Sequence, residues 1–326
     1  MSKFKVLLTD YAWPELDIEQ RTLAEVDAEL VVAADTDPKS LCALATDADA
    51  IMTNWVKVPA EVIDAAAKCK IVARLGIGLD NIDVEAASRR GMLVTNIPDY
   101  CLIEVAEHAL ALLLALARKV AFFHHQTKTG RYDLKAGPLL RRVEGQTLGI
   151  VGMGNIGRAL AAKAQGLGLK VLASDPVART APEGVRFCDL DELLANCDYV
   201  SLHVPLVPQT RHLISGPQLA RMKPSAYLIN TARGGLVDPA ALAAALSEGK
   251  LAGAGLDVQE PEPPDLSRPP WNDPRVIVTP HAAFASQESL IDLRTRTARQ
   301  VANCLSGGQV PHVVNQAALK GASTAR

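Results

Sequence analysis

Short β-rich runs that alternate with helical patterns are the feature that most restricts how this chain can fold. Five such runs occur in the first hundred residues, at 5–10, 29–34, 50–54, 71–75 and 92–97. Strands separated by helices pair in parallel, because a parallel connection has to cross back over the sheet. Asp37-Pro38 is typical of a helix start and Gly91 of a helix end. These residues therefore predict one complete α/β unit with a parallel sheet.

A second alternation predicts a second parallel sheet of about six strands. Its runs lie at 147–152, 170–175, 198–204, 226–232, 252–258 and 276–281. An apolar stretch from Glu104 to Val120 precedes them, and a helical stretch from Gln287 to Leu305 follows. We interpret these two stretches as helices that carry the chain out of the first domain and back. The prediction is an α/β fold of two doubly wound parallel-sheet domains, one of them discontinuous. The alternative is two domains in tandem, with the last helix as an appendage of the second.

Composition argues against several classes of protein. The 326 residues are 48% hydrophobic, and 34 basic against 36 acidic residues give a net charge of −2. This balance offers no positive surface for nucleic acid or an anionic membrane. The longest apolar stretch, Ala109 to Ala117, is far shorter than the roughly 20 residues that span a bilayer. The start, MSKFKVLLTDYAW, resembles a strand more than a signal peptide. The six cysteines include no CxxC pair, so we expect reduced thiols and a cytoplasmic location.

A glycine-rich turn follows the first strand of the second domain. Gly152, Gly154 and Gly157 form a GxGxxG motif between the strand TLGIV and a helical pattern. In dinucleotide-binding folds the first glycine makes the tight turn, the second lets the main chain approach the pyrophosphate, and the third lets helix and strand pack closely. The helix N-terminus then presents N–H groups to the phosphates. A motif of this kind is weak evidence alone, but its position between strand and helix predicts a dinucleotide site.

Asp175 ends the next strand, 18 residues after Gly157. A carboxylate there can accept hydrogen bonds from the ribose hydroxyls, and it repels a 2′-phosphate. On its own, Asp175 is equally compatible with a solvated turn before Pro176. Together with the glycine motif it predicts a nicotinamide dinucleotide and favours NAD over NADP.

Several motifs in one order indicate a family. They are GMGNIG (152–157), HVPLVPQT (203–210), NTARGGLVD (230–238), LDVQEPEPP (256–264) and TPHAAFAS (279–286), with RLGIGLDNIDVEAA (74–87) earlier in the chain. Over nearly its whole length the chain resembles the D-isomer-specific 2-hydroxyacid dehydrogenases, which include phosphoglycerate dehydrogenases. The last segment is especially similar to the C-terminal-binding-protein branch, which includes transcriptional corepressors.

The resemblance implies a role for each domain. Residues 1–101 and 286–326 would form the substrate domain, and residues 102–285 an inserted NAD-binding Rossmann domain through which the protein forms a homodimer. The implied cofactor contacts are Gly152, Gly154, Asn155, Ile156, Gly157, Asp175, His203, Val204, Pro205, Thr210, Thr231, Ala232, Arg233, Asp257 and His281. Asp257 would contact the nicotinamide side of the cofactor.

Reduction of a 2-keto acid needs a cation for the carboxylate and the ketone, and an acid for the developing alkoxide. Arg233 follows the strand AYLINTA, where open α/β sheets bind ligands, and its guanidinium can bind a carboxylate through two parallel hydrogen bonds. His281 follows the strand VIVTP and can act as the acid in reduction and the base in oxidation. Without the resemblance, a surface arginine and a structural histidine would be the simpler interpretations.

A carboxylate partner completes the expected catalytic group. At one ring nitrogen of His281 it would fix the tautomer and stabilise the imidazolium. By the resemblance, the catalytic glutamate stands five positions after Asp257, which selects Glu262 and leaves Glu260 as a solvated neighbour. The other histidines show no metal-ligand pattern, so no metal is expected, and His108 is assigned no chemistry.

Substrate contacts are expected in the first domain as well. By the resemblance, Gly76, Ile77 and Gly78 would offer main-chain N–H groups to the substrate carboxylate, which requires the close approach that glycine allows. Lys57 and Arg74 lie at carboxyl ends of strands, where either could bind a distal phosphate. The alternative is that Lys57 is solvated and that Trp55 closes a smaller apolar pocket.

The combined prediction is an NAD-dependent dehydrogenase that transfers a hydride between nicotinamide and a small 2-hydroxy or 2-keto acid of the phosphoglycerate, glycerate or glyoxylate type. Two alternatives stay open. One is an NAD-sensing, corepressor-like binding protein with little turnover, against which the presence of Arg233, Glu262 and His281 argues. The other is a related dehydrogenase of another small substrate, such as phosphite or formate.

Overall fold

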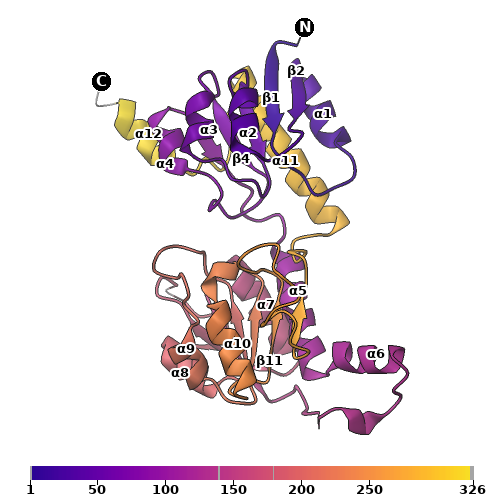
Figure 1. Cartoon of the computed structure of the whole chain (residues 1–326). Coiled ribbons are helices and arrows are strands. Elements are labelled where there is room, and N and C mark those ends of the chain that lie inside the picture. The colour runs from indigo at the N-terminus through magenta and orange to yellow at the C-terminus, as the bar shows by residue number, and fades with distance from the viewer. Residues whose placement is uncertain (1, 139, 179, 324–326) are drawn as a thin grey trace. The chain divides into compact units, whose positions relative to one another are not determined.

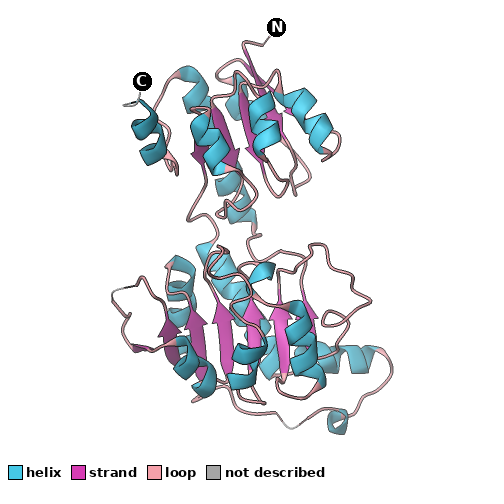
Figure 2. Ribbon diagram, turned by 60° about the vertical axis from the view of Figure 1, so that its left-hand side comes forward, coloured by secondary structure: helices cyan, strands magenta, loops and turns pink. Residues whose placement is uncertain are grey.

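The computed structural model describes residues 2–138, 140–178 and 180–323. The chain divides into two compact units, unit 1 with Met1–Tyr100 and Ser286–Arg326, and unit 2 with Cys101–Ala285. Each unit contains one sheet with helices on its two faces (Figures 1 and 2), and the paired strands of each sheet are parallel. The predicted α/β fold class is confirmed. In the described part of the chain, no helix is long and apolar enough to cross a membrane.

Unit 1 contains a five-stranded sheet in the order β2-β1-β3-β4-β5. Its strands are β1 (Phe4–Leu8), β2 (Ala28–Val32), β3 (Ala50–Thr53), β4 (Ile71–Arg74) and β5 (Leu93–Thr95). Its helices are α1 (Asp17–Ala24), α2 (Pro38–Ala45), α3 (Ala60–Ala65), α4 (Val84–Arg89), α11 (Gln287–Ser306) and α12 (Gln316–Ser323). All five predicted strands are present. Asp37 caps α2 by accepting hydrogen bonds from the N–H groups of Lys39 and Ser40.

The sheet of unit 1 separates two cores, because successive side chains of a strand point to opposite faces. Leu7 of β1 belongs to the core under α2, α3 and α4, whereas its neighbours Val6 and Leu8 belong to the core under α1 and α11. Residues of α11 such as Leu293 and Val301 are completely buried in this second core. Both ends of the chain therefore build unit 1 together.

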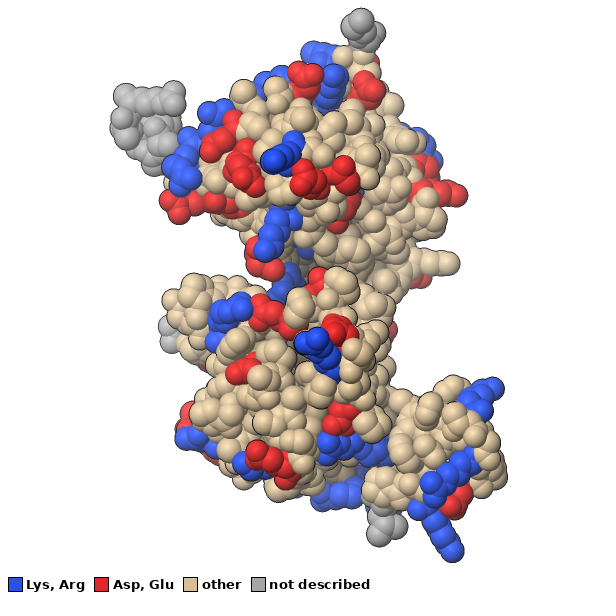
Figure 3. Space-filling view, in the orientation of Figure 1, with Lys and Arg blue, Asp and Glu red and all other residues tan. Residues whose placement is uncertain are grey.

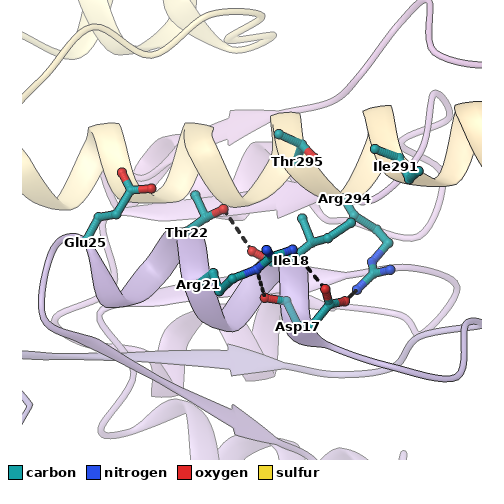
Figure 4. Close-up of a pocket in the computed structure, with 8 residues that line it drawn as sticks. All are labelled: Asp17, Ile18, Arg21, Thr22, Glu25, Ile291, Arg294 and Thr295. Atoms are coloured by element: carbon teal, nitrogen blue, oxygen red, sulfur yellow. Dashed lines mark hydrogen bonds and ion pairs between the residues drawn. The ribbon is translucent and has the colours of Figure 1, made fainter.

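Arg294 fixes α11 to α1. Its guanidinium donates hydrogen bonds to both carboxylate oxygens of Glu19, at 2.9 and 2.8 Å. It also donates to Asp17 at 3.0 Å (Figure 4). Glu19 is 0% exposed and Arg294 is 8% exposed. The hydrogen bonds between the two charged groups therefore replace those to water that each group loses on burial. A pocket of about 640 Å³ opens beside this pair, lined by Asp17, Ile18, Arg21, Thr22, Glu25, Ile291, Arg294 and Thr295.

Unit 2 contains a seven-stranded sheet in the order β12-β11-β10-β9-β6-β7-β8. Its strands are β6 (Thr147–Val151), β7 (Lys170–Ser174), β8 (Val185–Phe187), β9 (Tyr199–Leu202), β10 (Tyr227–Asn230), β11 (Gly253–Leu256) and β12 (Val276–Val278). Its helices are α5 (Leu102–Ala117), α6 (Val120–Lys128), α7 (Asn155–Gly166), α8 (Leu190–Asn196), α9 (Gly216–Arg221) and α10 (Pro239–Ser247), with short 3-10 helices at Leu134–Ala136 and Gly234–Leu236. The prediction of about six strands omitted β8, a three-residue edge strand that has no apolar run.

The sheet of unit 2 reverses its winding between β6 and β9. The chain first proceeds outward from β6 to β7 and β8, and then returns to place β9 on the other side of β6. In register, Val151 at the end of β6 lies opposite Leu202 at the end of β9. Open α/β sheets bind ligands beyond the carboxyl ends of their strands at such a reversal. The residues that follow these two strands are thus placed to line a ligand site.

Candidate active site

The site residues predicted in unit 2 lie on loops that follow the carboxyl ends of six parallel strands. The first residues of these loops are Gly152 after β6, Asp175 after β7, His203 after β9, Thr231 after β10, Asp257 after β11 and Thr279 after β12. Because these strands share one sheet and one direction, their carboxyl ends lie along one edge. Segments that are far apart in the sequence therefore meet there.

The three glycines of the GxGxxG turn have three different surroundings. Gly152 has a φ of +98°, and a Cβ there would lie 2.6 Å from the carbonyl oxygen of His203. A Cβ at Gly157 would lie 2.3 Å from the oxygen of Gly152, whereas one at Gly154 would meet no described atom within 4 Å. No side chain in the described residues caps the start of α7 at Asn155. The turn thus has the tight bend, the open space and the N–H groups that a pyrophosphate requires.

Asp175 supports this turn from the next strand. One carboxylate oxygen accepts the N–H of Met153 at 2.7 Å, and the other accepts those of Val177 at 2.7 Å and Ala178 at 2.9 Å. Burial acts to raise the pKa of Asp175, but these hydrogen bonds and the charge of Arg158 outweigh it and lower the pKa. The carboxylate is therefore charged at neutral pH. The sequence predicted that Asp175 binds the ribose hydroxyls, but it gave no signal that Asp175 also supports the glycine turn.

The segment after β9 lies against the glycine turn. A Cβ at Gly152 would also lie 2.8 Å from Cγ1 of Val204. Burial lowers the pKa of His203 to about 4, so its ring is neutral at neutral pH. Thr210 closes the loop by donating its hydroxyl hydrogen to the carbonyl oxygen of Pro205 at 2.7 Å. Four of the predicted cofactor contacts are thus held in one loop beside the turn.

Thr231 and Arg233 follow β10. Thr231 is 7% exposed, and its hydroxyl has no hydrogen-bond partner among the described residues. A buried polar group without a partner is unfavourable, so this position suits a polar ligand. The side chain of Asn230 fixes the turn by accepting from the N–H of Ala232 at 3.1 Å and donating to the oxygen of Arg233 at 2.8 Å. The cation predicted to bind substrate is therefore carried on a rigid turn.

The loops after β11 and β12 bring Glu262 and His281 together. Oε1 of Glu262 lies 3.0 Å from Nδ1 of His281, and the side chains are 38% and 22% exposed. Glu260 is engaged elsewhere, since Arg211 donates to it at 2.7 Å. Burial acts to raise the pKa of Glu260, but hydrogen bonds from Arg211 and His212 lower it. Glu260 is thus ion-paired and not simply solvated, and the partner of His281 is Glu262.

Asp257, for which a contact with the nicotinamide is predicted, has a buried side chain. Its side chain is 0% exposed. One oxygen accepts the hydroxyl hydrogen of Thr279 at 2.5 Å and the N–H of Ala282 at 2.9 Å, and the other accepts the N–H of Ala283 at 2.8 Å. The carboxylate thus supports the segment that carries His281, and its contact with the nicotinamide stays a prediction.

In unit 1, the predicted substrate loop is fixed through its carbonyl groups. The oxygens of Gly76, Ile77 and Gly78 accept hydrogen bonds from the N–H of Ile97 at 3.1 Å, Nδ2 of Asn96 at 2.7 Å and Nε of Arg74 at 2.9 Å. Arg74 is 6% exposed and also donates to Oδ1 of Asn54 at 3.3 Å. The guanidinium of Arg74 is thus buried beneath the loop that it holds, and its contact with a distal phosphate stays a prediction.

Lys57 and Trp55 lie on the loop after β3. Lys57 is exposed, and Trp55 is 43% exposed. Asp10, which follows β1, caps the start of this loop by accepting the N–H groups of Asn54 at 2.9 Å and Trp55 at 2.7 Å. One fixed loop thus presents both a cation and an aromatic ring. The two predictions, that Lys57 binds a distal phosphate or that Trp55 closes a smaller pocket, both stay open.

Comparison with known proteins agrees with this geometry. The family model described as D-isomer specific 2-hydroxyacid dehydrogenase, NAD binding domain, matches residues 110–283. The glyoxylate reductase of Korarchaeum cryptofilum is 42% identical over 322 residues, which cover 93% of this chain and 95% of that protein. The D-3-phosphoglycerate dehydrogenase of Methanocaldococcus jannaschii is 39% identical over 318 residues, which cover 95% of this chain and 59% of that protein.

A solved structure extends the similarity to the whole fold. The D-lactate dehydrogenase from Aquifex aeolicus, complexed with NAD and lactic acid, matches with a TM-score of 0.84 at 30% identity. The match covers 97% of this chain and 98% of that chain. The chain thus spans nearly all of this protein and of the K. cryptofilum relative, but only about three fifths of the M. jannaschii relative.

Proposed function

Because the chain belongs to the D-isomer specific 2-hydroxyacid dehydrogenases and carries their NAD binding domain, we propose that it reduces short 2-keto acids with NADH and oxidises the matching D-2-hydroxy acids. Membership of this family makes it an NAD-dependent oxidoreductase. The observation that carries the proposal is the contact of His281 with Glu262, on the sheet edge that also holds Arg233 and the glycine turn. A binding protein without turnover would not need this acid–base pair.

The roles of the residues follow from their chemistry. When bound, NADH supplies the hydride that the ketone carbon receives. Arg233 binds the substrate carboxylate and polarises the ketone. Glu262 accepts the hydrogen of Nδ1 of His281, so Nε2 is the nitrogen that protonates the developing alkoxide in reduction and takes the proton back in oxidation.

The distal group of the substrate is proposed to be small and without phosphate. One relative that matches over nearly its full length is named a glyoxylate reductase, and another is named a hydroxypyruvate reductase. Of the two cations that could have bound a phosphate, Arg74 is buried and only Lys57 is exposed. Glyoxylate and hydroxypyruvate are therefore the preferred candidates, and phosphohydroxypyruvate is the alternative that depends on Lys57.

A turnover assay tests this proposal. The purified chain is incubated with NADH or NADPH and with glyoxylate, hydroxypyruvate, pyruvate or phosphohydroxypyruvate, and the loss of reduced nicotinamide is followed. We expect the highest kcat/KM with NADH and one of the first two acids. Absence of turnover with all four acids, together with tight NADH binding, would favour the corepressor-like alternative.

We also propose that two copies associate through unit 2. Helix α6 has no buried residue, and Figure 1 shows it extending away from the sheet of unit 2. Val120 is 56% exposed, Tyr132 94% and Leu134 79%. In Figure 3 the surface of this segment is mostly uncharged, with basic side chains along its edge. Exposed apolar side chains on a projecting segment are typical of an interface.

We propose a reducing, cytoplasmic location for the protein. The six cysteines are free thiols, which supports this location.

A further inference from the structure

We propose that His108, on α5, is a positioning residue that fixes the His281 segment through Thr279 and Asp257. His108 has no place in the mechanism above, and the sequence assigned it no chemistry. The inference rests on the proposed function, because it concerns how the same acid–base group is held. It is carried by the packing of α5 on β11 and by a directed chain of hydrogen bonds.

Helix α5 lies unusually close to β11. At Gly255 of β11 a Cβ would lie only 3.0 Å from Cβ of Leu112, so the absence of a side chain lets the helix approach. His108 precedes Leu112 by four residues and therefore lies on the same face of the helix. Residues two apart along an extended chain lie on the same side of it, and Asp257 follows Gly255 by two residues. The ring of His108 is thus brought to the start of the loop after β11, with its side chain 24% exposed.

A carboxylate acceptor sets the direction of the hydrogen bonds at this point. Nε2 of His108 lies 3.0 Å from Oγ1 of Thr279 and 3.4 Å from Oδ1 of Asp257, and the threonine hydroxyl lies 2.5 Å from the same Oδ1. A carboxylate can only accept, so the single hydrogen of the threonine hydroxyl is donated to Asp257. Oγ1 must then accept from His108, which places a hydrogen on Nε2. The chain of donors runs from His108 to Thr279 and ends on the buried carboxylate.

This carboxylate holds both sides of the catalytic histidine. His281 has a φ of +53°, a left-handed conformation that residues other than glycine adopt rarely and keep only when their surroundings hold them. The carbonyl oxygen of Asp257 accepts the N–H of His281 at 2.8 Å. Its carboxylate accepts from Thr279 on one side and from Ala282 and Ala283 on the other. A change in the orientation of Asp257 would therefore be transmitted directly to His281.

Removal of the His108 donor leaves the threonine hydroxyl bonded to Asp257 but without the group that holds it from the other side. The bond to Asp257 then loses its alignment, and the segment from 279 to 283 is held less firmly against Glu262. Small errors in the position of a reacting group have large kinetic effects, about 100-fold for a displacement of roughly 1 Å. A loosened but folded segment should cost less, on the order of tenfold in kcat. The glycine turn is on another loop, so binding of NADH should not change.

The kinetic test compares variants that remove the donor of His108 or the hydroxyl of Thr279 with variants that keep the corresponding group. With the best keto acid, His108→Phe and Thr279→Val should each lower kcat by about tenfold, with less change in KM or in the Kd of NADH. His108→Gln, which retains an N–H donor, and Thr279→Ser, which retains the hydroxyl, should recover most of the loss. The double variant should lose no more than the larger single loss, because the two residues act in series.

Glu107→Gln is the matched control. Glu107 precedes His108 on α5, is 58% exposed and pairs with Lys163 at 2.9 Å, so its loss should leave kcat unchanged. A wild-type kcat in His108→Phe would overturn the inference. Equal losses in His108→Phe and His108→Gln, or additive losses in the double variant, would also overturn it.

Amide hydrogen exchange provides a readout that does not depend on turnover. The N–H groups of Ala282 and Ala283, which bond to Asp257, should exchange faster in His108→Phe than in the wild type, and at the wild-type rate in Glu107→Gln. Unchanged exchange in His108→Phe would overturn the positioning role, whatever the activity. Faster exchange in a protein that reduces no keto acid would support the positioning role and contradict only the proposed function.

Discussion

Oε1 of Glu262 lies 3.0 Å from Nδ1 of His281, although the two residues belong to loops that follow different strands. The contact places a carboxylate against one ring nitrogen of the histidine. In the proposed mechanism the other nitrogen, Nε2, exchanges the proton with substrate. This role can be measured.

The first prediction concerns this pair. His281→Ala should lower kcat by about 10² to 10⁴ and leave the Kd of NADH nearly unchanged, because general acid–base groups contribute about that much. Glu262→Gln removes the negative partner of the His281 ring and should also lower kcat, with little change in the Kd of NADH. The measurements are kcat with the best keto acid and titration with NADH. Wild-type turnover in either variant would contradict the assignment.

The second prediction concerns Asp175. Its carboxylate both repels a 2′-phosphate and accepts the N–H of Met153 in the glycine turn. Asp175→Ala should therefore narrow the preference for NADH over NADPH and also weaken NADH binding, by about tenfold for the lost charge-assisted hydrogen bonds. Asp175→Asn keeps an acceptor oxygen and should lose less NADH affinity. Titration of each variant with both nucleotides measures these effects. If Asp175→Ala bound NADH as tightly as the wild type, the support of the turn would be refuted.

The third prediction concerns Lys57 and the distal end of the substrate. If phosphohydroxypyruvate is reduced, Lys57→Ala should raise its KM much more than that of hydroxypyruvate, because only the former has an anion to pair with. Arg74→Lys serves as the contrast, since the buried Arg74 guanidinium holds the carbonyl of Gly78. It should impair both substrates alike. Equal effects of Lys57→Ala on the two acids would remove Lys57 from the site and leave Trp55 as the better candidate.

The fourth prediction concerns association. Sedimentation of the wild type should give the mass of a dimer. Val120→Glu combined with Leu134→Glu should give monomers, because both side chains are exposed on the projecting segment and a buried charge without a partner is unfavourable. Leu266→Glu, at a residue that is 61% exposed outside this segment, is the control and should stay dimeric. A dimer that persists in the double variant would place the interface elsewhere.

The fifth prediction concerns the attachment of α11. Arg294→Met leaves the fully buried Glu19 without its partner and should lower the free energy of unfolding by about 3 to 5 kcal/mol. Arg299→Met, which breaks the exposed pair with Glu25, should have little effect. Urea denaturation followed by tryptophan fluorescence measures both, because Trp13 lies 5.6 Å from the Arg294 guanidinium. Equal stability of the two variants would show that the buried pair does not secure the helix.

The amino-acid sequence was sufficient for features that depend on local order. The five strands of unit 1 and the positions of Gly152, Gly154 and Gly157 follow from hydrophobic runs and from a turn that only small residues permit. The strand β8 was not predicted, because it has three residues at a sheet edge and only one of them is buried. Such a strand has no hydrophobic run. Local patterns identify elements whose own residues carry the signal.

Tertiary structure alone decided how the polar groups are used. Arg74 and Asp257 were predicted to contact ligands, and only the structure reveals that both are buried and that each holds a loop. Asp175 supports a turn that precedes it by more than twenty residues, and His108 reaches Thr279 across 171 residues. The type of a side chain fixes what it can donate or accept. Which partner it meets depends on chain segments that only the folded sheet brings within hydrogen-bonding distance.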